Sequence, residues 1–200
     1  MKREQADLWE RWEQGHKIVV TTNVGWDPRT RRNNMGAGLA LQAARRWPWL
    51  PEWYGDFCRR SVMGRQTPTR TVPVLEHDQL RLIFLPVKPL LHYADPERSW
   101  DQPARLDVIR TGLARLTRHH GTIALAYPGC GNGGLKPSQV RPLLEMFLVE
   151  DRFTVCDWEF PLQAGDYRTG VNAAVAGLGM LDDALQSAGL RVRGGQIERA

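Results

Sequence analysis

Residues 122–135 read Thr-Ile-Ala-Leu-Ala-Tyr-Pro-Gly-Cys-Gly-Asn-Gly-Gly-Leu, a short apolar run that leads into four glycines within six residues. A helical pattern begins directly afterwards, at Pro137. Glycine permits positive φ angles and leaves backbone N–H groups open to a bound anion. The helix that follows adds the positive end of its dipole. The strand, glycine loop and helix together predict a phosphate-binding site.

A second glycine loop lies upstream, where residues 35–40 read Met-Gly-Ala-Gly-Leu-Ala. It too falls between a β-rich run, at residues 17–22, and a helical pattern, at residues 36–47. Ligands of parallel α/β sheets bind beyond the carboxyl ends of the strands, where both loops are expected. We therefore expect the two loops to hold the two phosphates of a diphosphate.

Short apolar runs alternate with helical patterns along the chain, which predicts an α/β layered sheet. The stretch at residues 26–34 is polar and rich in turn residues, so we expect a flexible loop there. A helix at residues 171–185 would be interrupted by Gly177 and Gly179, and residues 194–200 are expected to fray. The expected strands are residues 17–22, 72–75, 81–86, 122–126 and 153–156, with a turn at 76–79, and the expected helices are residues 7–13, 36–47, 53–60, 103–119 and 137–149.

The composition fits one domain of 200 residues with a buried core. The net charge of +5 favours anionic ligands, nucleic acid included. The three cysteines are far apart and form no cluster with histidine, which predicts a reducing cytoplasm and no metal site. The chain shows no signal core and no run long enough to span a membrane. We expect a cytoplasmic monomer that makes no membrane contact and needs no cofactor.

Four segments in this order resemble the macrodomain, a module that binds ADP-ribose. They are Gln-Ala-Asp-Leu at residues 5–8, Val-Val-Thr-Thr-Asn at 19–23 and the two glycine loops, of which the second is the most specific match. The resemblance implies a three-layer α/β/α fold with a mixed, largely parallel central sheet. It implies a macrodomain at residues 1–158, with residues 159–200 as a C-terminal extension.

The same resemblance assigns roles to individual residues. It implies that Asp7 contacts the adenine amine with Leu8 beside it, and that Asn23 hydrogen-bonds the distal ribose. From the residues alone, Asp7 equally fits a helix N-cap, Asn23 fits a turn at a strand end, and the glycines fit tight turns. The loop residues that the resemblance assigns to the ligand are Met35, Gly36, Ala37, Gly38, Leu39, Gly129, Cys130, Gly131, Asn132, Gly133, Gly134 and Leu135.

Within the family, the segment at residues 83–88, then Trp100 and the helix ending at 112–116, resembles ADP-ribosyl glycohydrolases related to terminal ADP-ribose glycohydrolase. That branch includes antitoxin macrodomains that remove ADP-ribose from DNA bases, and Lys88 falls on its catalytic lysine. Two departures stand out. Residues 26–33 are inserted before the first glycine loop, and Gly133 replaces an aspartate of the protein-directed enzymes. The DNA-directed antitoxins often carry glycine there, which slightly favours a nucleic-acid target.

Several alternatives stay open at this stage. A partly desolvated Lys88 could act as a nucleophile or base, keep its charge and polarise the scissile bond, or simply be a surface lysine. Cys130 fits a small packing residue better than a reactive thiolate. Trp26 and Trp100 are expected on loops at the pocket, where either could stack on adenine or a flipped base. The competing functions are a non-catalytic ADP-ribose reader, an ADP-ribose 1″-phosphate phosphatase and a basic nucleic-acid-binding module, the last supported by Arg29, Arg31 and Arg32.

Overall fold

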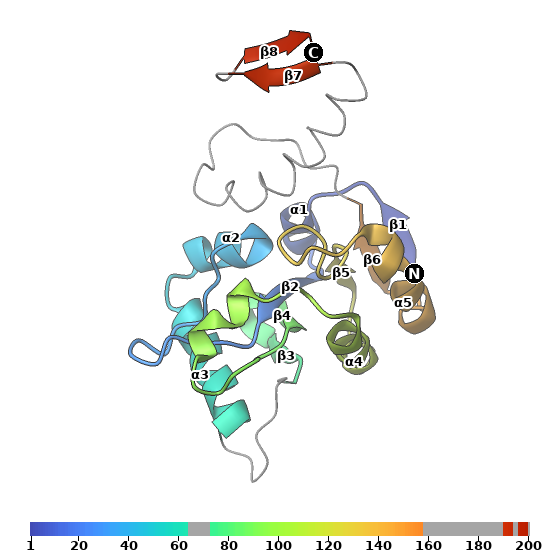
Figure 1. The fold of residues 1–200 in the computed structure, drawn as a ribbon. Coiled ribbons are helices and arrows are strands. Elements are labelled where there is room, and N and C mark those ends of the chain that lie inside the picture. The colour runs from blue at the N-terminus through green and yellow to red at the C-terminus, as the bar shows by residue number, and fades with distance from the viewer. Residues whose placement is uncertain (64–72, 158–189, 194–195, 200) are drawn as a thin grey trace. The chain divides into compact units, whose positions relative to one another are not determined.

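The computed structural model describes residues 1–63, 73–157, 190–193 and 196–199 (Figure 1). The chain divides into two compact units, Met1–Phe160 and Pro161–Ala200. The first unit contains a six-stranded sheet of order β1-β6-β5-β2-β4-β3, in which every pair is parallel except β3 with β4. The mixed, largely parallel sheet is therefore confirmed. Its strands are β1 (Lys2–Glu4), β2 (Lys17–Asn23), β3 (Leu75–His77), β4 (Leu82–Lys88), β5 (Ile123–Leu125) and β6 (Phe153–Cys156).

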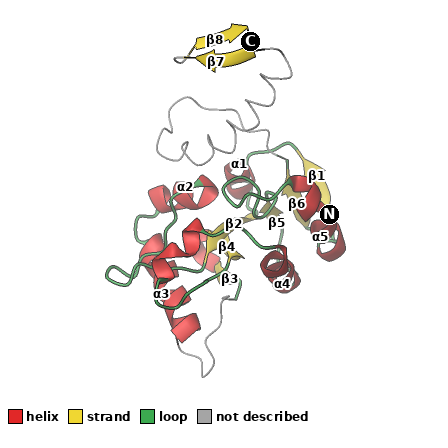
Figure 2. Ribbon diagram, viewed as in Figure 1, coloured by secondary structure: helices red, strands yellow, loops and turns green. Residues whose placement is uncertain are grey.

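Helices cover both faces of this sheet, which gives the expected three layers (Figure 2). The first three helices bury their apolar side chains in one core, and the last two bury theirs in the other. None of the described helices is long and apolar enough to cross a membrane. The helices are α1 (Leu8–Glu13), α2 (Gly38–Arg46), α3 (Leu50–Met63), α4 (Leu106–Leu116) and α5 (Pro137–Phe147), and the 3₁₀ segments are η1 (Asp78–Leu80) and η2 (Pro96–Asp101).

The central strands show why the sheet needs two helical layers. Along β2, Ile18 and Val20 enter the core under α1–α3, whereas Val19 enters the core under α4 and α5. Every residue of β4 is buried. Because successive side chains of a strand point to opposite faces, a continuous apolar strand must be covered on both sides.

Several element boundaries differ from the sequence-based expectation. Helix α4 begins at Leu106 rather than at residue 103, because Arg105 is extended and the Ala104 N–H donates to the carbonyl of Gly133. Helix α3 is longer than residues 53–60. Strand β3 occupies Leu75–His77, where part of a turn was expected, and the chain reverses instead through η1 and a left-handed Arg81.

The second unit contains a two-stranded antiparallel sheet of β7 (Leu190–Arg193) and β8 (Gln196–Arg199). The expected fraying of residues 194–200 is therefore wrong for β8, whose backbone is paired with β7 along its whole length. The helix expected at residues 171–185 lies outside the described residues.

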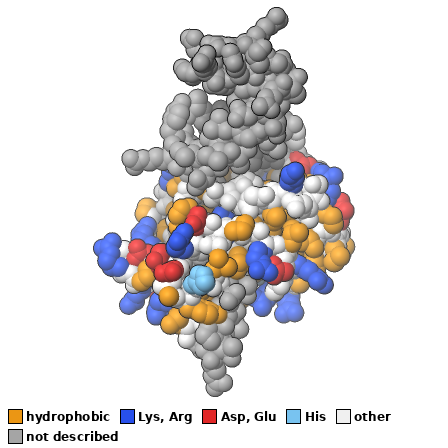
Figure 3. Space-filling model, viewed as in Figure 1, with side chains coloured by type: hydrophobic (Ala, Val, Ile, Leu, Met, Phe, Trp, Pro, Cys, Tyr) orange, Lys and Arg blue, Asp and Glu red, His pale blue; other side chains and the backbone are white. Residues whose placement is uncertain are grey.

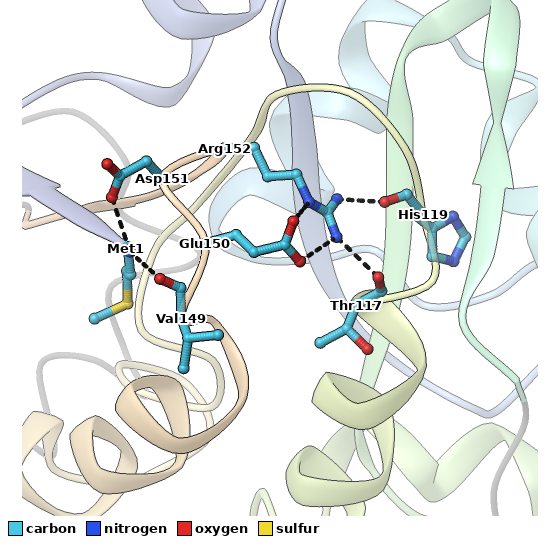
Figure 4. A network of polar contacts seen from close by, with 7 residues as sticks. All are labelled: Met1, Thr117, His119, Val149, Glu150, Asp151 and Arg152. Carbon is cyan, nitrogen blue, oxygen red and sulfur yellow. Dashed lines mark hydrogen bonds and ion pairs between the residues drawn. The ribbon is translucent and has the colours of Figure 1, made fainter.

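The amino ends of β5 and β6 are held by a polar network around Arg152 (Figure 4). Its guanidinium donates to the backbone carbonyls of Thr117 and His119 just after α4, and it pairs with Glu150 at 2.9 Å. A cation suits this position because the last carbonyls of a helix lack partners within it. The network fixes the connection from α4 to β5 at the sheet edge opposite the glycine loops.

Candidate functional site

The candidate site residues gather at one edge of the sheet. Strands β5, β2 and β4 are neighbours and parallel, so their carboxyl ends meet at this edge. The second glycine loop follows β5, the first follows β2, and Lys88 ends β4. Asp7 follows the carboxyl end of β1, which is also parallel to its neighbour. The topology therefore brings the predicted residues to the edge where ligands of parallel sheets bind.

The second glycine loop is closed by its own backbone. Gly134 donates to the carbonyl of Gly131 at 2.8 Å, and Leu135 donates to the carbonyl of Gly129 at 3.1 Å. Gly129, Gly131 and Gly134 all have φ near +78°, a region that other residues rarely adopt. Cys130 and Leu135 form an isolated parallel bridge, which directs the Gly131 N–H to the Leu135 carbonyl. Within the described chain, the N–H groups of Asn132 and Gly133 donate to no protein acceptor. Two consecutive free amides in a loop closed by its own backbone can receive an anion.

Gly133 is required for a different reason, which is space. A Cβ there would lie 2.3 Å from the carbonyl oxygen of Gly129 and 2.7 Å from Cβ of Ala104. Both neighbours are held in place, since Ala104 itself donates to the Gly133 carbonyl. No side chain fits at residue 133 in this loop conformation, which gives a physical reason for the glycine that replaces aspartate.

The first glycine loop leads directly into α2. The N-cap residue Ala37 makes no side-chain hydrogen bond to the first turn, so the N–H groups of Gly38, Leu39 and Ala40 have no acceptor in the described chain. Gly38 has φ +53°, and a Cβ there would meet open space. Met35 is buried in the core and offers only its backbone. The uncapped start of α2 is therefore a second position that suits an anion.

Asp7 is the N-cap of α1. Its Oδ1 accepts from the N–H groups of Trp9 at 2.7 Å and Glu10 at 3.2 Å. The capping alternative is therefore realised, and it does not exclude a ligand role, because Oδ2 is not used by the cap. Leu8 buries its side chain in the core beneath α1, which leaves only its backbone for a ligand.

Asn23 uses its whole amide within the protein. Its Nδ2 donates to the Asn34 carbonyl at 2.8 Å and to Oδ1 of Asn33, while its Oδ1 accepts from the Gly25 N–H and from Nδ2 of Asn33. Two donors and two acceptors are the full capacity of the side chain. A hydrogen bond from Asn23 to a ribose therefore requires that one of these contacts be exchanged.

The inserted stretch at residues 26–34 is held by hydrogen bonds, so the expectation of a flexible loop is wrong. The Asp27 carboxylate accepts from the N–H groups of Arg29 and Thr30, and Asn33 donates to the carbonyl of Pro51 in α3. Trp26 is 5% exposed and belongs to the core. It packs inside the domain, so the expected stacking of Trp26 on a base is not available in this arrangement.

Lys88 lies beside Asn23 in the register of β4 and β2, at a bulge in the pairing. It is 8% exposed, and its Nζ donates to the carbonyl of Trp100 at 2.7 Å. Burial lowers the pKa of Lys88, and the nearby Asp101 carboxylate partly opposes this. Lys88 is therefore not a solvated surface lysine, since it combines a desolvated amine with a single backbone acceptor.

Trp100 and Cys130 differ in what they offer. Trp100 lies in η2 and is 36% exposed, so its side chain is accessible to a ligand. Its backbone carbonyl accepts the hydrogen bond from Lys88. Burial raises the pKa of the Cys130 thiol to about 11, which makes a reactive thiolate unfavourable near neutral pH. The three cysteines are all unpaired, and no group of His, Cys, Asp and Glu side chains in the described residues could hold a metal ion.

Ser99 is a site-edge residue that sequence reasoning missed. It is 1% exposed, its hydroxyl donates to the Pro89 carbonyl at 3.1 Å and it accepts from the Val24 N–H at 3.2 Å. Nothing in its local sequence marks it, because the two segments that it joins are distant along the chain and meet only in the fold.

The comparison with solved structures identifies the fold. The macrodomain of Thermus aquaticus DarG superposes with a TM-score of 0.52 and 24% identity, over 80% of this chain and 97% of that chain. Thermosipho africanus DarTG in complex with ADP-ribose superposes with a TM-score of 0.52 and 19% identity, over 78% of this chain and 41% of that chain. No protein-family model and no curated protein matches the sequence.

The chain therefore has the macrodomain fold, as the resemblance of its sequence motifs implied. The carboxyl edge of this macrodomain-like fold carries two loops with free amides and a buried lysine.

Proposed function

We propose that this macrodomain binds ADP-ribose and hydrolyses the bond between ADP-ribose and a modified target. The observation that carries the proposal is the pairing of two rows of unpartnered amides with the buried amine of Lys88 at one sheet edge. The ADP-ribose complex of a structure with the same fold supports the ligand.

Each part of ADP-ribose has a receptor in this arrangement. The amides of Asn132 and Gly133 and of the first turn of α2 would receive the two phosphates, and Oδ2 of Asp7 would accept from the adenine amine. Trp100 is exposed and follows the segment that holds Lys88, so its indole could contact the group attached to the distal ribose. Nucleic acid is the favoured target class, because Gly133 follows the pattern of the DNA-directed branch and a flat base fits an exposed indole.

Lys88 supplies the chemistry at the distal ribose. Hydrolysis breaks the bond from the anomeric carbon to the target, the electron pair leaves with the target atom, and water provides the new hydroxyl and the proton for the leaving atom. The lowered pKa of Lys88 increases the neutral fraction of its amine, which favours a nucleophile or base over a permanent cation. Its place at the end of β4, beside Asn23, supports contact with the ribose.

A purely electrostatic nucleic-acid module is less well supported. On the face shown in Figure 3, arginine and lysine side chains lie in several separate places, with acidic side chains among them. Several arginines are already paired, among them Arg59 and Arg60 with Asp56 at 3.0 Å. A module that works through charge alone would gather its cations on one face.

The test measures binding and turnover separately. ADP-ribose at about 100 times its dissociation constant should stabilise the protein by about 2.7 kcal/mol, which a thermal shift detects. ADP-ribosylated DNA and ADP-ribosylated protein are then incubated with the wild type, Lys88→Ala and the exposed control Lys2→Ala. We expect turnover by the wild type and Lys2→Ala, and retained binding without turnover by Lys88→Ala.

Each competing function has its own result. Binding without product from any linkage would identify a reader, and phosphate released from ADP-ribose 1″-phosphate would identify a phosphatase. Equal turnover by the wild type and Lys88→Ala would remove Lys88 from the chemistry. DNA binding with a steep salt dependence that excess ADP-ribose leaves unchanged would favour the charge-based module.

A further inference from the structure

The amine of Lys88 is held by a main-chain atom, the carbonyl oxygen of Trp100, at 2.7 Å. A carbonyl moves only when its segment moves, so the position of Nζ depends on what holds η2 in place. Asp101, the next residue, adds a favourable charge from the same segment. The question for the site is therefore which contacts fix η2 against the ends of the strands.

Ser99 provides the central contact. Its hydroxyl bridges two main-chain groups, accepting from the Val24 N–H just after β2 and donating to the Pro89 carbonyl just after β4. The side chain is 99% covered, so no water replaces either contact when the hydroxyl is removed. One hydroxyl thus ties η2 to the exits of both strands that carry Asn23 and Lys88.

Gly25, which follows β2, allows the backbone to pack closely against η2. A Cβ at Gly25 would lie 2.1 Å from the carbonyl oxygen of Pro96 and 2.7 Å from Cβ of Ser99. The backbone of the β2 exit therefore lies directly against η2, with no room for a side chain. The close approach and the hydroxyl bridge act on the same short segment, one residue before Trp100.

We propose that Ser99 is a positioning residue for Lys88, because its buried hydroxyl locks η2 between the ends of β2 and β4 and so fixes the carbonyl that receives the Lys88 ammonium. The importance of this for catalysis rests on the proposed function. The geometry itself does not, so the two can fail separately.

The experiment follows the reactivity of Lys88 without any ADP-ribose. Trace acetylation across a pH series, read by mass spectrometry, reports all four lysines of the chain in one sample. In Ser99→Ala, freed η2 exposes the amine, so the limiting rate for Lys88 should rise by about threefold or more and its midpoint should move toward the ordinary lysine pKa of about 10.4. Ser99→Thr, which keeps the hydroxyl, should restore the wild-type profile.

The matched control is Tyr54→Phe, which removes another buried hydroxyl hydrogen bond, the one to Thr22, without touching η2. An unchanged Lys88 profile in folded Ser99→Ala would overturn the proposal, as would an equal change in Tyr54→Phe. If Ser99→Ala does not fold, Ser99→Cys is used in its place. The thiol fills the same space but hydrogen-bonds only weakly, so the acetylation profile of Lys88 should lie between those expected for the wild type and for Ser99→Ala. A wild-type profile in Ser99→Cys would then overturn the proposal. A shifted Lys88 profile in a protein without turnover would support the positioning role and refute the proposed function.

Discussion

Replacement of Gly133 by alanine tests the second glycine loop most directly. The new Cβ would lie 2.3 Å from the Gly129 carbonyl oxygen, 2.8 Å from the Gly129 carbonyl carbon and 2.7 Å from Cβ of Ala104. None of these atoms is the end of a flexible side chain, so the backbone of the loop must move. The free amides of Asn132 and Gly133 would then be displaced with it.

The cost has two parts. Forced insertion of a methyl group into a packed site costs about 2 kcal/mol. Displacement of the Gly133 carbonyl leaves the Ala104 N–H without its acceptor at 2.9 Å, which costs about 1 kcal/mol more. For a chain of this size, a loss of about 3 kcal/mol lowers Tm by about 6–12 °C. Loss of even one amide hydrogen bond to the diphosphate should lower the affinity for ADP-ribose by about tenfold, or 1.4 kcal/mol.

Two controls separate stability from binding. Gly134→Ala places its Cβ in open space and pays only for φ +78°, about 1 kcal/mol, so it should bind ADP-ribose nearly as the wild type does. Arg152→Ala loses charged hydrogen bonds at the opposite sheet edge, for about 2 kcal/mol, and should leave affinity unchanged. Calorimetric titration with ADP-ribose and thermal unfolding measure both quantities. Gly133→Ala with wild-type stability and wild-type affinity would refute the reasoning.

Two further predictions concern Asp7 and Cys130. Asp7→Asn keeps an N-cap of equal quality but places an amide where the adenine acceptor was, so Tm should stay the same while ADP-ribose affinity falls about tenfold or more. Asp7→Ala should lower both Tm and affinity. Unchanged affinity in Asp7→Asn would show that Asp7 serves only as a helix cap. Burial raises the pKa of Cys130 to about 11, so alkylation by iodoacetamide should be slow at pH 8 and accelerate toward pH 11, and rapid alkylation at pH 7 would contradict that burial. The stability that this shift contributes is fully present below the unfolded thiol pKa of about 8.5 and should be lost as pH rises toward 11. The decline should be smaller in Cys130→Ala, in which the raised pKa of Cys156 still contributes.

The parts of the fold that the sequence predicted are those whose signal is local. Strand β2 carries the apolar run Ile-Val-Val at residues 18–20, and β4 is apolar as far as Val87. The glycine loops carry their conformational requirement in their own residues. Strand β1 could not be predicted in this way. It has three polar residues, and it is a strand only because it pairs with β6, which lies about 150 residues along the chain.

The candidate site divides in the same manner. Lys88 and the glycine loops were predicted by motif, but the burial of Trp26 and the closed amide network of Asn23 depend on packing between distant segments. The stretch at residues 26–34 has the composition of a solvated loop. It is ordered because Gly55 in α3 lets the backbone approach, with a Cβ there only 2.0 Å from the Arg31 carbonyl oxygen. Such contacts have no signature in the loop itself.

The carboxyl edge of the sheet separates binding from chemistry. In the proposed complex, the diphosphate is received by backbone amides, which do not titrate and which belong to the glycine loop and to the start of α2. Lys88 contributes a buried amine that donates to the Trp100 carbonyl, and burial lowers its pKa while the Asp101 carboxylate partly opposes this. Because this proposed binding of the phosphates needs no side-chain cation, the contacts of Ser99 can change the pKa of Lys88 without lowering the affinity for the substrate. It follows that turnover should fall as the pH drops below the lowered pKa of Lys88, while the affinity for ADP-ribose should change little over the same range.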